Sequence, residues 1–196
     1  MGAAQDDAAR PCAGRICPAG AVFAFPTDTV YGLGVRANDQ EAIQKLRALK
    51  SRPAPAPFSL HLRDVVQLQA CCAPLSRRQR QWIAQLLPGP YTVLLPAGKG
   101  APKDAVMQGK IGIRVPAGAA FSHVARAFGA LLGTSVNRAG APPLNDPDAI
   151  LEAFGQDIAL LITTEAPFSA ISSAVLDLCV DPPQAVRGQL PPDLMA

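Results

Sequence analysis

Residues 25–34 read FPTDTVYGLG and place two hydroxyls, a carboxylate and a phenol directly after an apolar run. The apolar residues 21–25 predict a short buried strand. Pro26 ends the hydrogen bonding of that strand because it has no N–H to donate. A polar cluster at the end of a buried strand is where α/β proteins usually bind ligands. The same pattern is also typical of an ordinary turn whose hydroxyls bond their own backbone, so this run alone leaves both interpretations open.

Two further segments place cations where the negative charge of a ligand would be stabilised. Lys50 and Arg52 stand at the end of a predicted helix. There they either complement the helix dipole or bind phosphate, lysine as a point charge and arginine as a bidentate fork. Arg114 lies between β-branched residues of a predicted strand at 111–115, so its own face of the strand needs an anionic partner. An internal acid and a substrate carboxylate would meet that need equally well.

The remaining candidates are imidazole, hydroxyl, amide and guanidinium groups next to other predicted strands: His61, Ser135, Asn137, Ser173 and Arg187. The turn at 134–140 is suited to a backbone nest for phosphate, although a plain Asx turn explains it as well. Together these groups favour anion binding and stabilisation of developing charge. They include few acid–base pairs, and the sequence has no P-loop, GxGxxG or GxSxG motif. The pattern therefore predicts phosphoryl or acyl-phosphate chemistry that relies on positioning and electrostatics.

Strands and helices alternate along the chain, which is the arrangement that would position these groups. Strands are predicted at 21–25, 57–62, 91–95, 111–115, 131–135, 158–162, 174–179 and 185–187. Helices are predicted from Asn38 or Asp39 to Pro53 and at 64–72, 76–87, 119–128 and 147–154. Residues 97–110 are predicted as a loop or lid. The alternation lacks strict βαβ regularity, which favours a mixed α/β sheet with flanking helices.

The bulk properties are those of one globular domain of 196 residues, with 49% hydrophobic and 17% charged side chains. A net charge of +3 suits an anionic ligand and is too small to indicate a nucleic-acid surface. The N-terminal acids and the lack of a long apolar run predict a cytoplasmic protein with no membrane partner. The cysteines have no zinc-type spacing, so we expect reduced thiols and no metal site. They are Cys12, Cys17, Cys71, Cys72 and Cys179.

In chain order, the segments PTDTVYGLG, KSRP, PGPYTVLL, GIRVP, TSVNRAG and SSAVLDL resemble motifs of the YrdC family, the threonylcarbamoyl-AMP synthases. The resemblance implies a twisted α/β sheet around a large basic cavity, in a single domain over 1–196 whose segments 1–17 and 188–196 are peripheral. It also implies a nucleotidyltransferase that condenses L-threonine, bicarbonate or CO2, and ATP, with Mg2+, into threonylcarbamoyl-AMP and pyrophosphate. The product would pass to a tRNA threonylcarbamoyl transferase complex for t6A formation, and weak binding to tRNA or double-stranded RNA is a further expectation.

The resemblance also carries roles over to individual positions. On the threonine side it implies Thr27, Tyr31, His61, Arg114 and Ser173. On the nucleotide side it implies Lys50, Arg52, Ser135, Asn137 and Arg187, with Lys50 and Arg52 as the catalytic phosphate-binding pair. The implied reaction needs no protein nucleophile, in agreement with the lack of a catalytic triad.

Several positions depart from the family pattern, mostly on the nucleotide side. They are Ala56, Lys110, Val136 and Ala174, and Arg138 adds a charge that would either compensate for Ala56 or alter the ligand. Two alternatives therefore stay open. One is a diverged YrdC-like paralogue that forms a carbamoyl-adenylate with another substrate. The other is a non-catalytic module that binds nucleotide or double-stranded RNA.

Overall fold

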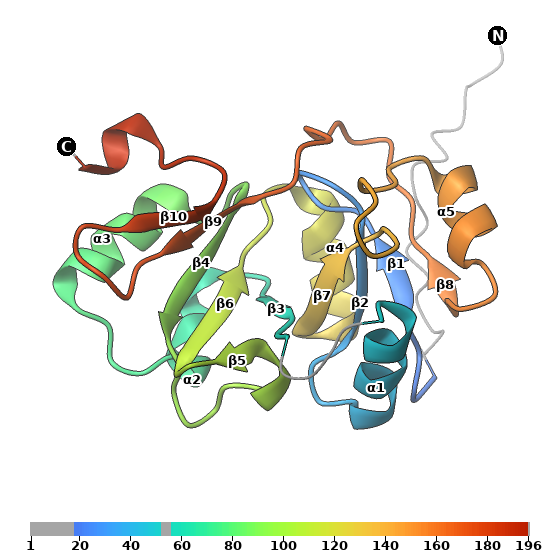
Figure 1. Cartoon of the computed structure of the whole chain (residues 1–196), viewed down its shortest axis with the longest axis horizontal. Coiled ribbons are helices and arrows are strands. Elements are labelled where there is room, and N and C mark those ends of the chain that lie inside the picture. The colour runs from blue at the N-terminus through green and yellow to red at the C-terminus, as the bar shows by residue number, and fades with distance from the viewer. Residues whose placement is uncertain (1–17, 52–55, 196) are drawn as a thin grey trace, which may run out of the picture.

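The computed structural model describes residues 18–51 and 56–195, and their strands form one ten-stranded mixed sheet. The strand order is β10-β9-β4-β6-β3-β7-β2-β1-β8, with β5 paired to β6 beside this path (Figure 1). Arg52, Cys12 and Cys17 lie outside the described residues. The predicted mixed α/β architecture is confirmed.

The strands are β1 Phe23–Phe25, β2 Gly32–Arg36, β3 Ser59–His61, β4 Tyr91–Pro96, β5 Val106–Met107, β6 Lys110–Arg114, β7 Leu131–Ser135, β8 Leu160–Leu161, β9 Ala174–Asp177 and β10 Gln184–Arg187. The helices are α1 Gln40–Leu49, α2 Leu68–Cys71, α3 Arg77–Leu86, α4 Ala119–Phe128 and α5 Pro147–Phe154. Short 3-10 turns lie at Val65–Gln67, Lys103–Ala105 and Pro192–Met195. None of the described helices is both long and apolar enough to cross a bilayer.

Local capping signals define where two helices begin. Asp39 caps α1 by accepting a hydrogen bond from the backbone N–H of Ala42. Ser76 caps α3 in a capping box with Gln79, in which each side chain accepts a hydrogen bond from the other residue's backbone N–H. These contacts satisfy N–H groups that the first turn of a helix leaves without partners. The predicted starts of both helices are therefore confirmed.

Strand β2 is not among the strands predicted from the sequence, because glycine is uncommon inside a strand. The glycines lie in a strand that pairs with β1 and places Phe25 opposite Gly32. A Cβ added to Gly32 or Gly34 would lie 2.7 or 2.5 Å from the Phe25 ring. The ring therefore crosses the surface of β2, and only glycine leaves room for it. The β1–β2 pair is a hairpin whose connecting loop, residues 26–31, carries the polar cluster.

We expect Gly34→Ala to lower the free energy of unfolding by about 2–3 kcal/mol, since overpacking a filled core commonly costs this much. The Phe25 ring is fully buried. The matched control is Gly112→Ala on β6, where the new Cβ would meet its nearest atom at 3.5 Å, an ordinary contact. Urea unfolding measures both variants, and equal stabilities would contradict the packing role of Gly34.

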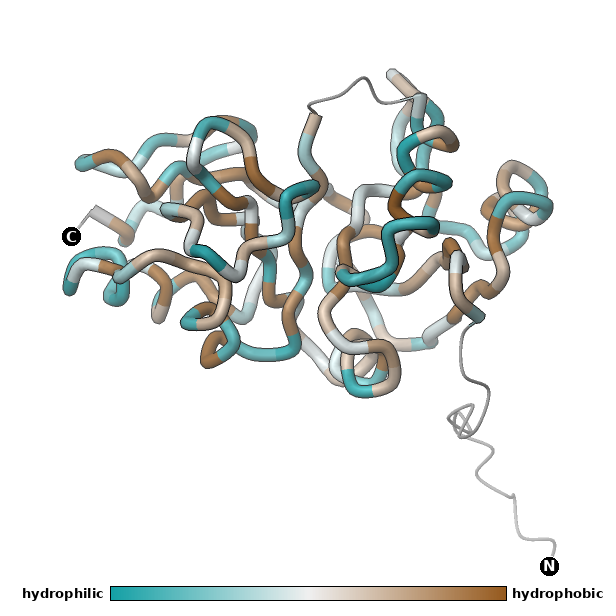
Figure 2. Tube along the Cα trace, turned by 90° about the horizontal axis from the view of Figure 1, so that it is seen from below, coloured by the Kyte–Doolittle hydropathy of each residue, from teal (hydrophilic) through white to brown (hydrophobic). Residues whose placement is uncertain are grey.

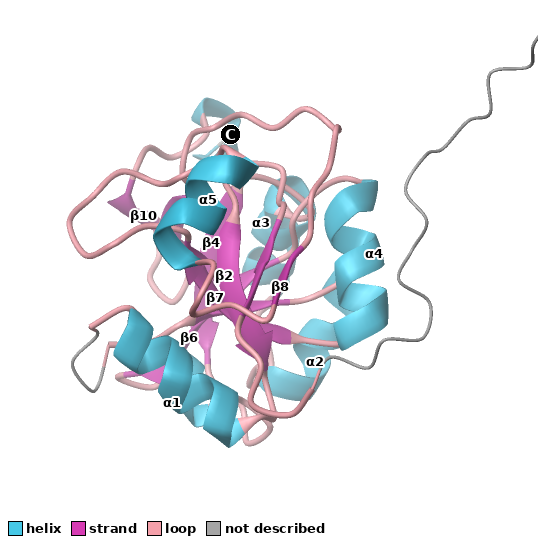
Figure 3. Cartoon of the chain, turned by 90° about the vertical axis from the view of Figure 1, so that its right-hand side faces the viewer, coloured by secondary structure: helices cyan, strands magenta, loops and turns pink. Residues whose placement is uncertain are grey.

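The two faces of the sheet differ in what covers them. The larger core contains alternate strand residues such as Leu33, Leu60 and Ile113, together with residues of α1, α3 and α5. A smaller core on the other face joins Phe23 and Phe25 to α4. Figure 3 shows α4 on one side of the sheet and α1 and α5 on the other. Figure 2 shows polar residues mostly on the outer loops and outward helix faces. The face that carries the smaller core is therefore covered by a helix at one end only.

Two segments differ from their predicted form. Residues 97–110 contain a 3-10 turn and β5, and Ala97 N–H donates to the carbonyl of Gly109. None of these residues lines the pocket described below, so the segment is part of the sheet and does not cover the site. The tail at 188–196 is predicted to be peripheral, yet Leu194 is only 3% exposed within the larger core. Its apolar side chain packs against the body of the protein.

Candidate active site

Strand register aligns five residues of five neighbouring strands into one row across the sheet. His61 of β3 is level with Arg114 of β6, and Arg114 is level with Thr92 of β4. Thr92 is level with Val175 of β9, and Val175 with Arg187 of β10. Residues at equal level in paired strands point to the same face. The row therefore forms the floor of a hollow on the face that α4 covers only at one end.

A pocket of about 140 Å³ opens above this row. That volume has room for on the order of ten water molecules, so the pocket fits a molecule of small amino-acid size. The predicted site residues that line it are Thr27, Tyr31, His61, Arg114, Ser135, Ser173 and Arg187. Two of these are arginines and none of the described lining residues is an acid, so the pocket is basic, as the resemblance implies, but it is smaller than the large cavity that the resemblance implies.

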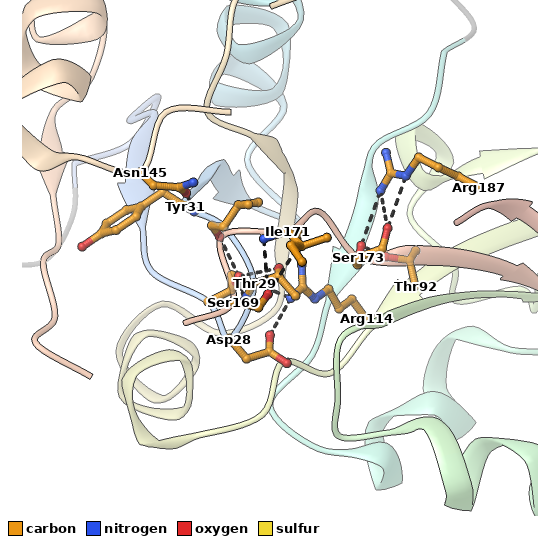
Figure 4. A network of polar contacts seen from close by, with 12 residues as sticks. Asp28, Thr29, Tyr31, Thr92, Arg114, Asn145, Ser169, Ile171, Ser173 and Arg187 are labelled. Carbon is orange, nitrogen blue, oxygen red and sulfur yellow. Dashed lines mark hydrogen bonds and ion pairs between the residues drawn. The ribbon is translucent and has the colours of Figure 1, made fainter. Parts of the chain in front are cut away.

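Arg114 is buried and ion-paired with an acid of the 26–31 loop. Its Nη2 donates to Asp28 Oδ1 at 2.5 Å, to Thr29 Oγ1 at 2.5 Å and to Thr27 Oγ1 at 3.3 Å. The side chain of Arg114 is 5% exposed and that of Asp28 16%. Burial is the main cause that lowers the pKa of Arg114, opposed by the charge of Asp28. Asp28 is therefore the anionic partner that the sequence predicts for Arg114. Arg114 also lines the pocket (Figure 4).

His61 lines the pocket and carries a hydrogen-bond acceptor. Its Nδ1 lies 3.1 Å from the carbonyl oxygen of Ser59. A carbonyl only accepts hydrogen bonds, so Nδ1 carries the proton and Nε2 carries the lone pair. The ring packs against those of Phe25 and Phe121. Its pKa falls from 6.5 to about 3, first because of burial and second because of the positive charge of Arg114. His61 is therefore neutral and suited to accept a hydrogen bond from a ligand hydroxyl.

The lowered pKa of His61 predicts a loss of stability in mild acid. Between pH 6.5 and about 3 the unfolded chain binds a proton at His61 that the folded chain does not, so stability falls as pH falls. From about pH 7 to about pH 5 this one group should lower the free energy of unfolding by about 2 kcal/mol. The measurement is urea unfolding at both pH values for the wild type and His61→Gln. Identical pH dependence in the two proteins would show that His61 is protonated in the folded state.

Three polar side chains form a second cluster at the other end of the row. Ser173 Oγ lies 3.0 Å from Thr92 Oγ1, and both residues are buried. The exposed Arg187 donates from Nε and Nη2 to the Ser173 carbonyl at 3.2 and 2.8 Å. A β-bulge in β10 sets Arg187 level with Val175. Arg187 thereby fixes Ser173 and keeps a positive charge at the pocket mouth (Figure 4).

Lys50 supports the turn that follows β7. Its Nζ donates to the Ser135 carbonyl at 3.1 Å, to Asn137 Oδ1 at 2.6 Å and to the Asn137 carbonyl. Ser135 Oγ donates to Asn137 Oδ1 at 2.8 Å, and Asn137 Nδ2 donates to the Ala141 carbonyl at 2.7 Å. The structure therefore brings Lys50, Ser135 and Asn137 together at one strand end. Only Ser135 of these three lines the pocket.

The segment that links β8 to β9, residues 162–173, crosses the top of the molecule in Figure 1, and we call it the strap. It is held by the 26–31 loop. The Phe168 ring stands edge-on to Tyr31 at 5.7 Å, and Ser169 N–H donates to the Asp28 carbonyl at 3.1 Å. Burial raises the pKa of Tyr31, and a hydrogen bond from the backbone of Thr164 opposes that rise. Tyr31 lines the pocket and also anchors the strap.

Sequence reasoning did not single out Asp28 or Thr92 as site residues. Asp28 is within the first motif, but a charge in a turn gives no sign that it pairs with a residue 86 positions away. Thr92 is in a short apolar strand, and only the strand register places it next to Arg114.

Three of the residues that depart from the family pattern make contacts within the protein. Arg138 donates to the Ala153 carbonyl at 2.9 Å and lies over the Phe154 ring, so it points to α5. The Ala56 carbonyl accepts from Arg47, and Lys110 pairs with Asp177 at 2.5 Å. Arg138 therefore does not occupy the space near Ala56.

Comparisons with known proteins show which family the chain is similar to. The model of the Sua5/YciO/YrdC family, described as telomere recombination, matches residues 15–188. A threonylcarbamoyl-AMP synthase of Chromobacterium violaceum is 38% identical over 146 residues, which are 72% of this chain and 75% of that protein. The crystal structure of Pyrococcus abyssi Sua5 complexed with L-threonine matches with a TM-score of 0.79 at 28% identity.

That match covers 86% of this chain and 50% of the Pyrococcus protein, so the chain spans about half the length of that relative. The crystal structure of Escherichia coli YciO has a TM-score of 0.75 at 26% identity and covers 86% of this chain and 82% of YciO. The family model spans most of the sequence, and these solved structures share the overall fold of the chain. The chain belongs to the Sua5/YciO/YrdC family.

Proposed function

We propose that the protein is an L-threonylcarbamoyladenylate synthase, a nucleotidyltransferase that forms threonylcarbamoyl-AMP and pyrophosphate from L-threonine, bicarbonate or CO2, and ATP. One observation carries the proposal: a pocket of amino-acid size contains a buried guanidinium and a neutral imidazole that offers a lone pair. The curated relatives of this chain that carry the name threonylcarbamoyl-AMP synthase support it. We further infer that 1–196 is a single domain and that the product passes to a tRNA threonylcarbamoyl transferase complex.

Threonine fits the donors and acceptors of the pocket. Its carboxylate would accept hydrogen bonds from Arg114, and its hydroxyl would donate to Nε2 of His61, the neutral acceptor. Thr92 lies beside Arg114 in the row, and its hydroxyl and that of Ser173 can donate to a second anionic group. The carbamate formed on the threonine nitrogen is such a group.

The nucleotide would occupy the open side of the pocket, next to Ser135 and Arg187. Lys50 would then act by holding the Ser135–Asn137 turn and, together with Arg52, by stabilising the negative charge of the phosphates. The described residues contain no group of three or more His, Cys, Asp or Glu side chains placed to hold a metal ion. Mg2+ would therefore enter bound to the phosphates of ATP, as it commonly does.

The proposed reaction has two steps. First, the neutral amine of threonine attacks CO2, which forms the N–C bond, and the nitrogen then releases a proton to solvent to give a carbamate. Second, a carbamate oxygen attacks the α-phosphorus of ATP, and the bond to the bridging oxygen breaks as pyrophosphate leaves. The protein contributes by holding the reactants in line and by stabilising charge, and no side chain forms a covalent bond.

The test is mass-spectrometric detection of the adenylate from purified protein with ATP, Mg2+, bicarbonate and L-threonine. We expect product and pyrophosphate only when threonine is present, and loss of both in Arg52→Ala. Turnover of ATP that is independent of threonine would favour the paralogue that uses another substrate. Affinity for double-stranded RNA that falls steeply with salt, without any turnover, would favour the binding module.

A further inference from the structure

The hydrogen bonding between β2 and β7 ends on an incomplete pair. The last regular pair is Gly32 with Ser135, and the next pair in register is Tyr31 with Val136. In a regular antiparallel pair of this kind, each residue donates its N–H to the carbonyl of the other. Val136 N–H donates to the Tyr31 carbonyl at 3.0 Å, but the Val136 carbonyl accepts from Leu144 N–H at 2.7 Å. The N–H of Tyr31 therefore needs another acceptor.

Asn145 supplies that acceptor with its side chain. Its Oδ1 accepts from Tyr31 N–H at 3.2 Å, across 114 positions of the chain (Figure 4). A backbone N–H only donates, so the amide oxygen of Asn145, and not its nitrogen, must face Tyr31. The contact is possible because the preceding residue, Leu144, is bonded to Val136. A side chain thus completes the pair that the two strands leave open.

The peptide group that Asn145 contacts is held from its other side by Thr27. This group joins Val30 to Tyr31, and the Thr27 hydroxyl donates to its oxygen at 2.6 Å. A peptide group is planar, so hydrogen bonds to its N–H and to its carbonyl fix the orientation of the whole group. Thr27 Oγ1 in turn accepts from Arg114 Nη2 at 3.3 Å. Asn145 is therefore connected to a pocket residue through one peptide group, although it does not itself line the pocket.

We propose that Asn145 is a positioning residue for the amino-acid side of the pocket, which sets the places of Thr27 and Tyr31 through the peptide group that it holds. This inference rests on the proposed function. Thr27 and Tyr31 both line the pocket, and Tyr31 is only 1% exposed. Without the amide oxygen of Asn145, the N–H of Tyr31 would lose its acceptor, and a buried donor without a partner is costly. The peptide group would turn, and both pocket residues would shift with it.

The effect should be limited to the amino-acid side. The nucleotide side depends on other contacts of the same part of the chain, since Lys50 holds Ser135 and Asn137. Those contacts do not involve Asn145. Loss of its amide oxygen should therefore weaken threonine binding and leave the KM for ATP unchanged. A purely structural role would lower the free energy of unfolding without such a difference between the two substrates.

The test measures the affinity for L-threonine by isothermal titration calorimetry and the KM for ATP by steady-state kinetics. It uses the full-length wild type, Asn145→Ala, Asn145→Asp and Asp146→Ala. Asn145→Asp is the conservative variant, because its carboxylate keeps an acceptor oxygen in nearly the same place. Asp146→Ala is the matched control. Asp146 also accepts from a backbone N–H, that of Asp148 at 3.1 Å, and caps α5, but it does not line the pocket.

We expect Asn145→Ala to bind L-threonine about three- to tenfold more weakly, the range that loss of one hydrogen bond between neutral groups commonly gives. Its KM for ATP should be that of the wild type. Asn145→Asp should bind threonine nearly as the wild type does. Asp146→Ala should unfold at a lower urea concentration, because a helix cap is lost, and should keep the wild-type threonine affinity.

Three results would overturn the proposal and leave the synthase function intact. They are unchanged threonine affinity in Asn145→Ala, an equal weakening of threonine and ATP in that variant, and an Asn145→Asp protein as weak as Asn145→Ala. A wild type that binds no threonine and forms no adenylate would overturn the proposed function and this inference with it.

Discussion

Arg114→Ala should strongly reduce threonine-dependent synthesis of the adenylate and destabilise the fold. Removing one partner of a buried ion pair costs about 3–5 kcal/mol, because the remaining charge has no counter-ion. Asp28, whose side chain is 16% exposed, would be that remaining charge. Loss of a buried charged contact to the substrate costs at least about 2 kcal/mol more in binding, so kcat/KM for threonine should fall at least about 30-fold. Pyrophosphate release and urea unfolding measure the two effects.

A double variant separates the two effects of Arg114→Ala. Arg114→Ala combined with Asp28→Asn removes both charges, so it should recover much of the stability while synthesis of the adenylate stays as low as in Arg114→Ala. Arg47→Ala is the control, since it breaks the Arg47–Asp104 pair outside the pocket. That variant should lose stability and keep the wild-type KM for threonine. A folded Arg114→Ala protein with wild-type kcat/KM would restrict Arg114 to a structural role.

Lys50→Met should raise the KM for ATP at least about tenfold and leave threonine affinity unchanged, since one hydrogen bond to a charged group is worth about 1.5–3 kcal/mol. The ammonium holds the Ser135 carbonyl and both oxygens of Asn137. Without it the turn after β7 loses its fixed shape, and Ser135 is the residue of that turn that lines the pocket. Steady-state kinetics with varied ATP measure the KM for ATP, and calorimetry with threonine alone measures the affinity for threonine.

Lys45→Met is the matched control on the same helix. Lys45 is exposed and paired with Glu41 across one turn, with side chains 54% and 66% exposed. Such a surface pair contributes at most about 1 kcal/mol, so this variant should retain the wild-type KM for ATP and nearly the wild-type stability. Equal kinetics in Lys45→Met and Lys50→Met would contradict the role of Lys50 in forming the nucleotide side.

Much of the fold and the chemical character of the site could be predicted from the sequence. Helix starts at Asp39 and Ser76 are visible because capping involves residues two to four positions apart. Apolar runs before polar turns identified most strands and the groups at their ends. The need of Arg114 for an anion also followed from its place within a β-branched strand. These signals are local, so a single chain reveals them.

The tertiary structure alone decided which groups meet. The Phe25 ring packs against the glycines of β2, and the GLG pattern does not indicate this contact. The row from His61 to Arg187 exists because five strands pair in one register and a bulge shifts β10. Asp28 and Arg114 are 86 residues apart in the chain, and pairing over such a separation depends on the packing of the whole sheet. Residue types therefore determined which chemistry was available, and long-range strand pairing determined where it takes place.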